Sequence, residues 1–333
     1  MRTVPGDAER VPFLVLTGFL GSGKTTLLNR LLREGGRWLV LMNEFGKEAL
    51  DQALLERQDI PLALLSGGCV CCTVRGALAP MLRNLHMSRS AGTVCFDGVV
   101  METSGVADPG PVLDTLLQDR WLAARYRLLA IVTAIDAQHG LERIENFPEA
   151  ARQVALADSL LITKTDLVGP GAVEPLRQKL RQMNPAAETV IAAHGEWEAN
   201  TLLVSSGTAP RKELARRLVL PAGGGTAFES AARVFNEPLR GDVLSVLDCL
   251  VAGVGHSLLR IKGVLELEGE PCPVVVHAMA GHLYPCVRLA AWPEGKRRSR
   301  LVTIGLAADR DVMRAFFNEF ERLAGCGNSS LQV

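Results

Sequence analysis

The sequence predicts an α/β domain with a mostly parallel sheet, followed by a smaller α+β domain. Up to about residue 195, short apolar runs of buried-strand type alternate with segments whose apolar residues recur at helical spacing. Strands that are apolar throughout are typical of parallel sheets covered by helices on both faces. The length of 333 residues favours about two domains, and 48% hydrophobic residues allow each to bury a core.

The expected strands of the first domain cover residues 11–17, 38–42, 60–65, 98–101, 128–135 and 160–163. The expected helices cover residues 25–34, 49–58, 75–88, 112–118, 149–157 and 173–183. Asp108-Pro109 is interpreted as a helix start. In a sheet of this class the ligands gather at the carboxyl ends of the strands, so the segments after the strands are where chemistry is expected.

Regular alternation ends before a stretch rich in serine, proline and glycine. Beyond it, we expect strands at 231–235, 258–266, 274–278, 287–290 and 301–304, with helices at 241–252 and 311–323. The predicted organisation is a first domain at 1–204, a linker at 205–227 and an α+β domain at 228–333.

Composition narrows the class of function. The 36 basic and 36 acidic residues cancel, so no electrostatic footprint for nucleic acid or an anionic membrane is expected. No apolar run reaches the roughly 18 residues that span a bilayer, and the polar N-terminal segment does not resemble a secretory signal. Eight cysteines in such a chain indicate a reducing cytoplasm, where clustered thiols serve metal or redox chemistry better than disulfides.

The segment from Gly18 to Thr25 has the pattern G-x-x-x-x-G-K-T between an expected strand and an expected helix. Such a loop turns backbone N–H groups toward phosphate oxygens, while the lysine reaches the β- and γ-phosphates and the threonine ligates Mg²⁺. The first domain is therefore predicted to be a P-loop NTPase domain. The alternative is a glycine turn with a solvated lysine. The residues expected to bind nucleotide here are Gly18, Gly21, Ser22, Gly23, Lys24, Thr25 and Thr26.

Two further segments fit a nucleotide site. Glu102 follows an apolar strand in the manner of a Walker B carboxylate, and would hold Mg²⁺ or position the attacking water; an ordinary strand-end glutamate is the alternative. Gly105 could bring a backbone N–H to the γ-phosphate. We expect Lys24, Glu102 and Gly105 to act in hydrolysis.

Thr163-Lys164-Thr-Asp166 is the candidate base-reading motif. The carboxylate of Asp166 can accept hydrogen bonds from guanine N1–H and N2–H₂, which adenine cannot offer. Lys164 is expected to lie along the base. The usual guanine signature, N-K-x-D, has asparagine where this chain has Thr163, and this departure weakens the expected preference without removing its main determinant. GTP is favoured over ATP.

Cys69, Cys71 and Cys72 present three soft ligands between an expected strand and an expected helix. We expect an extended segment in which Cys69 and Cys71 share one side. Three thiolates suit Zn²⁺ or Cu⁺, with Co²⁺ possible, and leave one position open for an incoming ligand. For Glu44 two interpretations stay open: it adds an oxygen ligand, or it belongs to a surface switch loop. A buried or redox-active cysteine cluster is the alternative.

The remaining cysteines are less informative. We interpret Cys95, Cys249 and Cys326 as small buried hydrophobic residues. Cys272, His277, His282 and Cys286 have no recognised ligand spacing, so strand packing is favoured over a second metal site.

With these motifs in place, the chain resembles the CobW family of P-loop GTPases, which includes cobalamin-synthesis proteins and zinc metallochaperones. The motifs that carry the resemblance are residues 18–27, 43–46, 67–72, 102–105 and 259–263. It implies weak GTPase activity, a metal at the cysteine triplet and delivery to a client metalloprotein. Three departures are Thr163 for asparagine, Lys47-Glu48-Ala49 for an acidic stretch, and the lack of a histidine-rich segment.

The resulting hypothesis is a cytoplasmic GTPase metallochaperone that uses GTP, Mg²⁺ and Zn²⁺ or Co²⁺. Its expected partner is a client metalloprotein or an enzyme of metal-cofactor biosynthesis, with no nucleic acid and no membrane. Two alternatives stay open: a P-loop ATPase or kinase with structural cysteines, and a non-catalytic metal buffer or regulator switched by GTP.

Overall fold

The computed structural model describes residues 10–33, 36–43, 62–64, 70–169, 171–192, 228–279, 281–289, 292, 297–324 and 329–332. These residues belong to two compact units. One draws on Met1–Gln153, Ala157–Leu176 and Thr189–Gly207, and the other on Val154–Leu156, Arg177–Glu188 and Thr208–Val333. The domain boundaries expected from the sequence stay a prediction.

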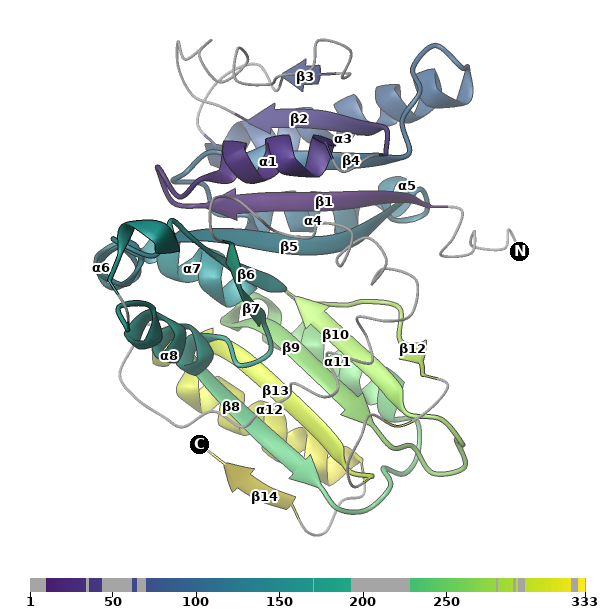
Figure 1. The fold of residues 1–333 in the computed structure, drawn as a ribbon. Coiled ribbons are helices and arrows are strands. Elements are labelled where there is room, and N and C mark those ends of the chain that lie inside the picture. Colours follow the sequence, from purple (N-terminus) through teal and green to yellow (C-terminus); the bar gives the residue numbers. More distant parts are fainter. Residues whose placement is uncertain are drawn as a thin grey trace. The chain divides into compact units, whose positions relative to one another are not determined.

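The first sheet has the strand order β3-β2-β4-β1-β5-β6-β7 in the described part of the chain (Figure 1). Its strands are β1 Val11–Gly18, β2 Trp38–Asn43, β3 Leu62–Leu64, β4 Gly98–Thr103, β5 Tyr126–Asp136, β6 Ser159–Thr163 and β7 Glu188–Ala192. The pairings of β1 with β4 and β5, of β2 with β3 and β4, and of β5 with β6 are parallel. Every residue of β4 and β6 is buried, which explains their lack of alternation.

Helices accompany this sheet in the described part of the chain. They are α1 Lys24–Arg33, α3 Val70–Ser90, α4 Gly110–Gln118, α5 Arg120–Ala123, α6 Gly140–Asn146, α7 Pro148–Leu156 and α8 Val173–Met183. In Figure 1, α1 lies in front of the sheet and α3 and α4 lie behind it. The leucines of α1 at positions 27, 28, 31 and 32 are buried in a core cluster with residues of β1, β2 and β5. This packing fixes the helix that follows the glycine loop.

The second sheet is antiparallel, with the order β11-β10-β9-β13-β8-β14 and β12 paired to β10. Its strands are β8 Phe228–Phe235, β9 Leu258–Leu265, β10 Val274–Met279, β11 His282–Leu283, β12 Val287–Arg288, β13 Ser299–Leu306 and β14 Ser329–Gln332. Two helices, α11 Val243–Val254 and α12 Arg310–Leu323, contribute Leu247, Phe316 and Phe320 to its core. The predicted fold class, a parallel α/β domain followed by an α+β domain, is confirmed.

Several elements differ from the sequence prediction. The strands β7, β11 and β14 and the short helices α5 and α6 were not expected. Four of the five residues of β7 are only partly buried or exposed, so it lacks the apolar run of a central strand. Helix α3 begins at Val70, five residues before the expected start at Arg75. The β-branched residues of this stretch, Val70, Thr73 and Val74, have low helix propensity, yet the stretch is helical.

Two cysteine interpretations were wrong. Cys95 and Cys249 are exposed rather than buried. Cys95 precedes β4 in a surface loop, and Cys249 lies on the outward face of α11 between the buried Leu247 and Val251. Cys326 and the helix expected at 49–58 lie outside the described residues. No helix in the described part of the chain combines the length and apolar character needed to cross a membrane.

Candidate functional site

The glycine loop connects the end of β1 to the start of α1. Gly18 has φ 142°, and a Cβ atom there would lie 2.4 Å from the backbone oxygen of Ala134 in the neighbouring strand β5. Glycine is therefore required at this position both by its backbone conformation and by the close approach of β5. The loop leaves the sheet at the carboxyl edge, where P-loop proteins bind phosphate.

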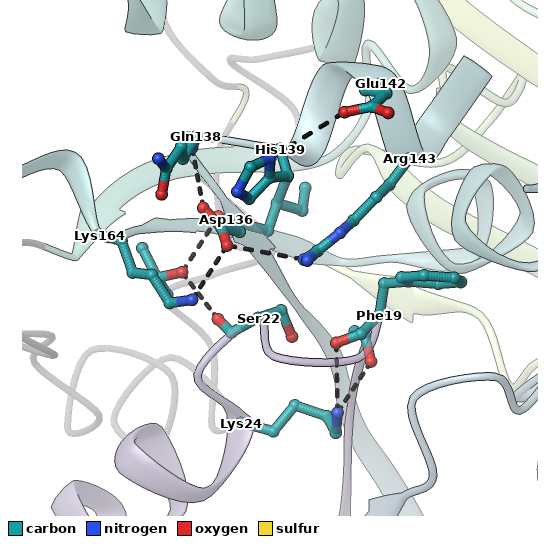
Figure 2. A network of polar contacts seen from close by, with 12 residues as sticks. Phe19, Ser22, Lys24, Asp136, Gln138, His139, Glu142, Arg143 and Lys164 are labelled. Atoms are coloured by element: carbon teal, nitrogen blue, oxygen red, sulfur yellow. Dashed lines mark hydrogen bonds and ion pairs between the residues drawn. The ribbon is translucent and has the colours of Figure 1, made fainter. Parts of the chain in front are cut away.

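The Lys24 side chain curls back from the start of α1 toward Phe19 in this loop (Figure 2). Its Nζ donates to the backbone oxygen of Gly18 at 3.0 Å and of Phe19 at 3.4 Å. The ammonium is thus held at the loop whose amides would surround a phosphate group. Phosphate oxygens are stronger acceptors than carbonyls for a cationic donor, so a bound nucleotide can take over these hydrogen bonds.

Thr25 and Glu102 are brought together from α1 and β4. The Thr25 hydroxyl donates to Glu102 Oε1 at 3.3 Å, and Glu102 is 6% exposed. The parallel register of β1 with β4 places Glu102 beside Leu16, two residues before the loop begins. Adjacent oxygen ligands of octahedral Mg²⁺, each roughly 2.1 Å from the ion, lie about 3 Å apart. The two oxygens therefore fit a shared Mg²⁺ site.

The loop after β4 packs directly on the glycine loop. A Cβ atom on Gly105 would lie 2.6 Å from the backbone nitrogen of Leu20, so a larger residue would push the two loops apart. On its other side, the buried Gln153 of α7 donates from Nε2 to the backbone oxygens of Gly105 (3.2 Å) and Ala107 (2.9 Å). Gln153 was not identified from the sequence, since only the fold brings it to this loop.

Thr163 is hydrogen-bonded to the glycine loop. Its hydroxyl donates to the backbone oxygen of Ser22 at 2.7 Å and also approaches that of Ile135 at 3.2 Å. The residue is 4% exposed. The hydroxyl therefore braces the glycine loop through the Ser22 carbonyl. Asp166 is exposed in the short helix Thr165–Leu167, three residues further on.

Lys164 interacts with a carboxylate that the sequence analysis did not identify. Its Nζ lies 3.0 Å from Oδ2 of Asp136, the last residue of β5. Arg143 Nη1 lies 3.6 Å from the same oxygen, and the backbone N–H of Gln138 donates to Oδ1 at 2.8 Å (Figure 2). Burial raises the pKa of Asp136, but the hydrogen bonds from Lys164 and Gln138 outweigh it and hold the pKa below its ordinary value.

Comparisons with known proteins match two parts of the chain to family models. Residues 12–191 match the family model described as CobW/HypB/UreG, nucleotide-binding domain. Residues 229–321 match the one described as cobalamin synthesis protein cobW C-terminal domain. The chain belongs to the CobW family.

Curated relatives of this CobW-family chain align over almost its whole length. It is 32% identical to the zinc chaperone YjiA of Escherichia coli over 309 residues, which cover 91% of the chain and 96% of the relative. It is 26% identical to the zinc chaperone CobW of a Sinorhizobium species over 348 residues, which cover 92% and 96% respectively. The crystal structure of a Zn(II)-bound triple mutant of the YjiA GTPase superposes with a TM-score of 0.70 at 26% identity, covering 93% of this chain and 99% of that one. The predicted family is confirmed.

The expected metal ligands of the CobW-family chain are only partly within the described residues. Cys69 and Glu44 lie outside them. Cys71 and Cys72 lie in the first turn of α3, where the helix is described but their side chains are not. The expectation of an extended segment through Cys71 was therefore wrong, because the helix starts at Val70.

No group of three histidine, cysteine, aspartate or glutamate side chains that could hold a metal occurs among the described residues. Of the four residues interpreted as packing residues, Cys286 is partly buried against the core of the second sheet. His277 stacks on Tyr284 with ring centroids 4.6 Å apart, and burial raises the pKa of the Cys286 thiol.

Proposed function

We propose that this protein is a GTP-hydrolysing metallochaperone that binds Zn²⁺ and delivers it to a client metalloprotein or an enzyme of metal-cofactor biosynthesis. The observation that carries the proposed binding of nucleotide is the 3.3 Å hydrogen bond from the Thr25 hydroxyl to Glu102 Oε1 beside the glycine loop. The printed names of the relatives, zinc chaperone and GTPase, support the metal half and the hydrolytic activity.

In this proposal the glycine loop, with Ser22 and Thr26, surrounds the phosphates of GTP. Lys24 stabilises charge on the β- and γ-phosphates, and Thr25 and Glu102 hold Mg²⁺, which would neutralise phosphate charge. Glu102 also orients the attacking water. Gly105, held against the glycine loop on one side and by Gln153 on the other, offers its backbone N–H as a sensor of the γ-phosphate.

Asp166 is the proposed determinant of guanine. Its carboxylate accepts hydrogen bonds from N1–H and N2–H₂ of the base, while the stem of Lys164 lies along the ring. Because the hydroxyl of Thr163 is directed to the Ser22 carbonyl, threonine at this position leaves recognition of the base to Asp166. GTP is therefore the proposed substrate in preference to ATP.

Cys69, Cys71 and Cys72 are the proposed ligands of the transported metal. Cys71 and Cys72 lie in the first turn of α3, where the positive end of the helix dipole favours the thiolate form. Three thiolates suit Zn²⁺, and Co²⁺ is the alternative cargo. Glu44 either supplies an oxygen ligand or belongs to a switch loop. A fourth position open to exchange suits transfer to a client.

Nucleotide and metal are proposed to be coupled through the carboxyl edge of the sheet. The β2–β4 register pairs Asn43 with Thr103, so the segments after these two strands begin side by side. Cytoplasmic location and the absence of nucleic acid and membrane partners remain part of the proposal, on the basis of the balanced charge and the cysteine content.

A competition titration of Zn²⁺ against a chromophoric chelator, with and without Mg²⁺ and a non-hydrolysable GTP analogue, tests the proposal. We expect tighter Zn²⁺ binding with nucleotide and, by linkage, tighter nucleotide binding with Zn²⁺ by the same factor. A Cys71→Ser variant should lose the Zn²⁺ affinity but keep nucleotide binding. Equal Zn²⁺ affinity in the two conditions would contradict the coupling.

The same preparations separate the two alternatives. A P-loop ATPase or kinase with structural cysteines would prefer ATP and turn over normally after Cys71→Ser. A GTP-switched metal buffer would show no increase in single-turnover hydrolysis when a client is added.

A further inference from the structure

Asp136 occupies a position that the motifs do not explain. It is the last residue of β5, and the parallel register with β6 places it directly opposite Thr163. The backbone N–H of the next residue, Ala137, donates to the Thr163 oxygen at 2.9 Å. The sheet itself therefore fixes a carboxylate, only 2% exposed, beside the segment expected to read the base.

A buried carboxylate is costly to desolvate, and this one is compensated by cationic side chains. Lys164 Nζ lies 3.0 Å away and Arg143 Nη1 lies 3.6 Å away, both from Oδ2. The Arg143 guanidinium also lies over the ring of Phe19, 5.7 Å from its centroid. Asp136 thus connects the candidate base-reading lysine to an arginine beside the glycine loop.

The backbone of Lys164 is in an unusual conformation. With φ 56° it is left-handed, and no other non-glycine residue has a positive φ in the part of the chain that the structure describes. A side chain in this region is disfavoured unless its surroundings hold it, and such residues cluster at binding sites. Here the preceding residue, Thr163, donates its hydroxyl to the Ser22 carbonyl, and Asp136 holds the ammonium at the far end of the Lys164 side chain. Figure 2 shows the Lys164 side chain running toward Asp136.

We infer that Asp136 is a positioning residue for base recognition: by holding the Lys164 ammonium, it fixes the aliphatic stem of Lys164 as a preformed surface for the purine ring. This inference rests on the proposed GTP site. Asp136 does not touch the nucleotide. It orders the long, flexible side chain of Lys164 before GTP binds, so that binding costs less conformational entropy.

If Asp136 acted only through its charge, its removal would have the opposite effect on GTP affinity. Asp136 is a negative charge next to a site for a triphosphate, and its neutralisation would leave Lys164 and Arg143 more strongly positive. If the charge of Asp136 mattered only through the general field, Asp136→Asn would tighten the binding of GTP. Positioning through Lys164 predicts weaker binding, so the sign of the change separates the two roles.

The test compares GTP with tripolyphosphate, each with Mg²⁺, on the full chain carrying Asp136→Asn. We expect the Kd of GTP to rise roughly threefold to tenfold, which is the affinity lost when one long side chain must be ordered on binding. Tripolyphosphate has no base and should bind as in the wild type or more tightly. The control is Asp97→Asn, which removes a carboxylate from an exposed ion pair with Arg37 in the same unit and should change neither Kd.

A change of less than twofold for GTP, tighter GTP binding, or equal weakening of both ligands would overturn the inference. A second variant, Lys164→Met, keeps most of the stem but loses the ammonium, and should weaken GTP by the same factor as Asp136→Asn. The double variant should then be no weaker than either single one, because both changes remove one interaction. Additive losses would overturn the inference even if Asp136→Asn alone were poorly folded. Failure of the wild type to bind GTP would instead refute the proposed function.

Discussion

Gly105→Ala perturbs the contact between the loop after β4 and the glycine loop. The added Cβ would lie 2.6 Å from the Leu20 nitrogen, 2.7 Å from its Cδ2 and 2.8 Å from its Cα. Gly105 does not have the positive φ that disfavours alanine, so the cost comes from contact alone. A rotamer change of Leu20 can relieve the contact with Cδ2 but not the two contacts with its backbone, and the loops must move apart.

The size of the effect follows from these contacts. Overpacking of this kind costs about 1–3 kcal/mol, and alanine recovers roughly 0.4–1 kcal/mol by restricting the unfolded chain. The net loss in free energy of unfolding is then about 1–2 kcal/mol. If the same energy is lost when the loops close around GTP, hydrolysis slows by roughly 5- to 30-fold, at about 1.36 kcal/mol for each factor of ten.

Thermal unfolding and single-turnover GTP hydrolysis measure the two effects of Gly105→Ala. The matched control is Gly253→Ala in helix α11, where an added Cβ meets no atom within 4 Å. This control should gain up to about 1 kcal/mol in stability and leave hydrolysis unchanged. A Gly105→Ala protein with wild-type melting temperature and turnover would refute the argument that the two loops form one close-packed unit.

Three further substitutions test the site. Thr163→Val should lower the free energy of unfolding by about 1–2 kcal/mol, because the Ser22 carbonyl loses its donor. The ratio of GTP to ATP affinity in competition binding should not change, and an altered ratio would place Thr163 at the base. Gln153→Leu releases two carbonyls of the loop after β4, and should lower the free energy of unfolding by about 2–3 kcal/mol in thermal unfolding. It should also reduce the rate of single-turnover hydrolysis by a larger factor than GTP affinity. Equal losses would argue against a role in positioning that loop. Thr25→Val should weaken GTP roughly tenfold in Mg²⁺ but not in EDTA, and a loss in both conditions would count against the shared Mg²⁺ site with Glu102.

The parts of the site predicted from the sequence are those whose chemistry fixes both residue type and spacing. A phosphate loop needs glycines, a lysine and a hydroxyl at set intervals, and Gly18, Lys24 and Thr25 supply them where β1 passes into α1. Glu102 was identifiable because it follows an apolar run, and the β1–β4 register brings it to Thr25. Local pattern and parallel topology were sufficient for these residues.

Asp136 and Gln153 could not be found in this way. Asp136 is significant because β6 pairs with β5 and brings Lys164 to it, 28 residues away in the chain. Gln153 is significant because α7 packs near a loop 48 residues earlier, where it donates to Gly105. A strand-end aspartate and a mid-helix glutamine have no distinctive local pattern, and their roles depend on contacts that only the fold creates.

The start of helix α3 also could not be predicted from the local sequence. Its first five residues include Val70, Thr73 and Val74, whose β-branched side chains lower helix propensity, and the sequence predicts a later start. The helix nevertheless extends through Cys71 and Cys72. Intrinsic propensity differs by only about 0.7 kcal/mol among such residues, so tertiary contacts can decide the boundary.

These differences have a consequence for how nucleotide affinity is determined. The residues proposed to touch GTP are restricted by the chemistry of phosphate and guanine, so Lys24 and Asp166 resemble their counterparts in other P-loop proteins. Asp136 and Gln153, which hold Lys164 and the Gly105 backbone in place, are restricted only by the local packing of this fold. A chain that keeps the motifs but replaces Asp136 with a neutral residue should therefore still select guanine through Asp166 but bind it less tightly. Selectivity and affinity would then depend on different residues, and measurements of the GTP-to-ATP ratio and of the GTP Kd across such variants should change independently.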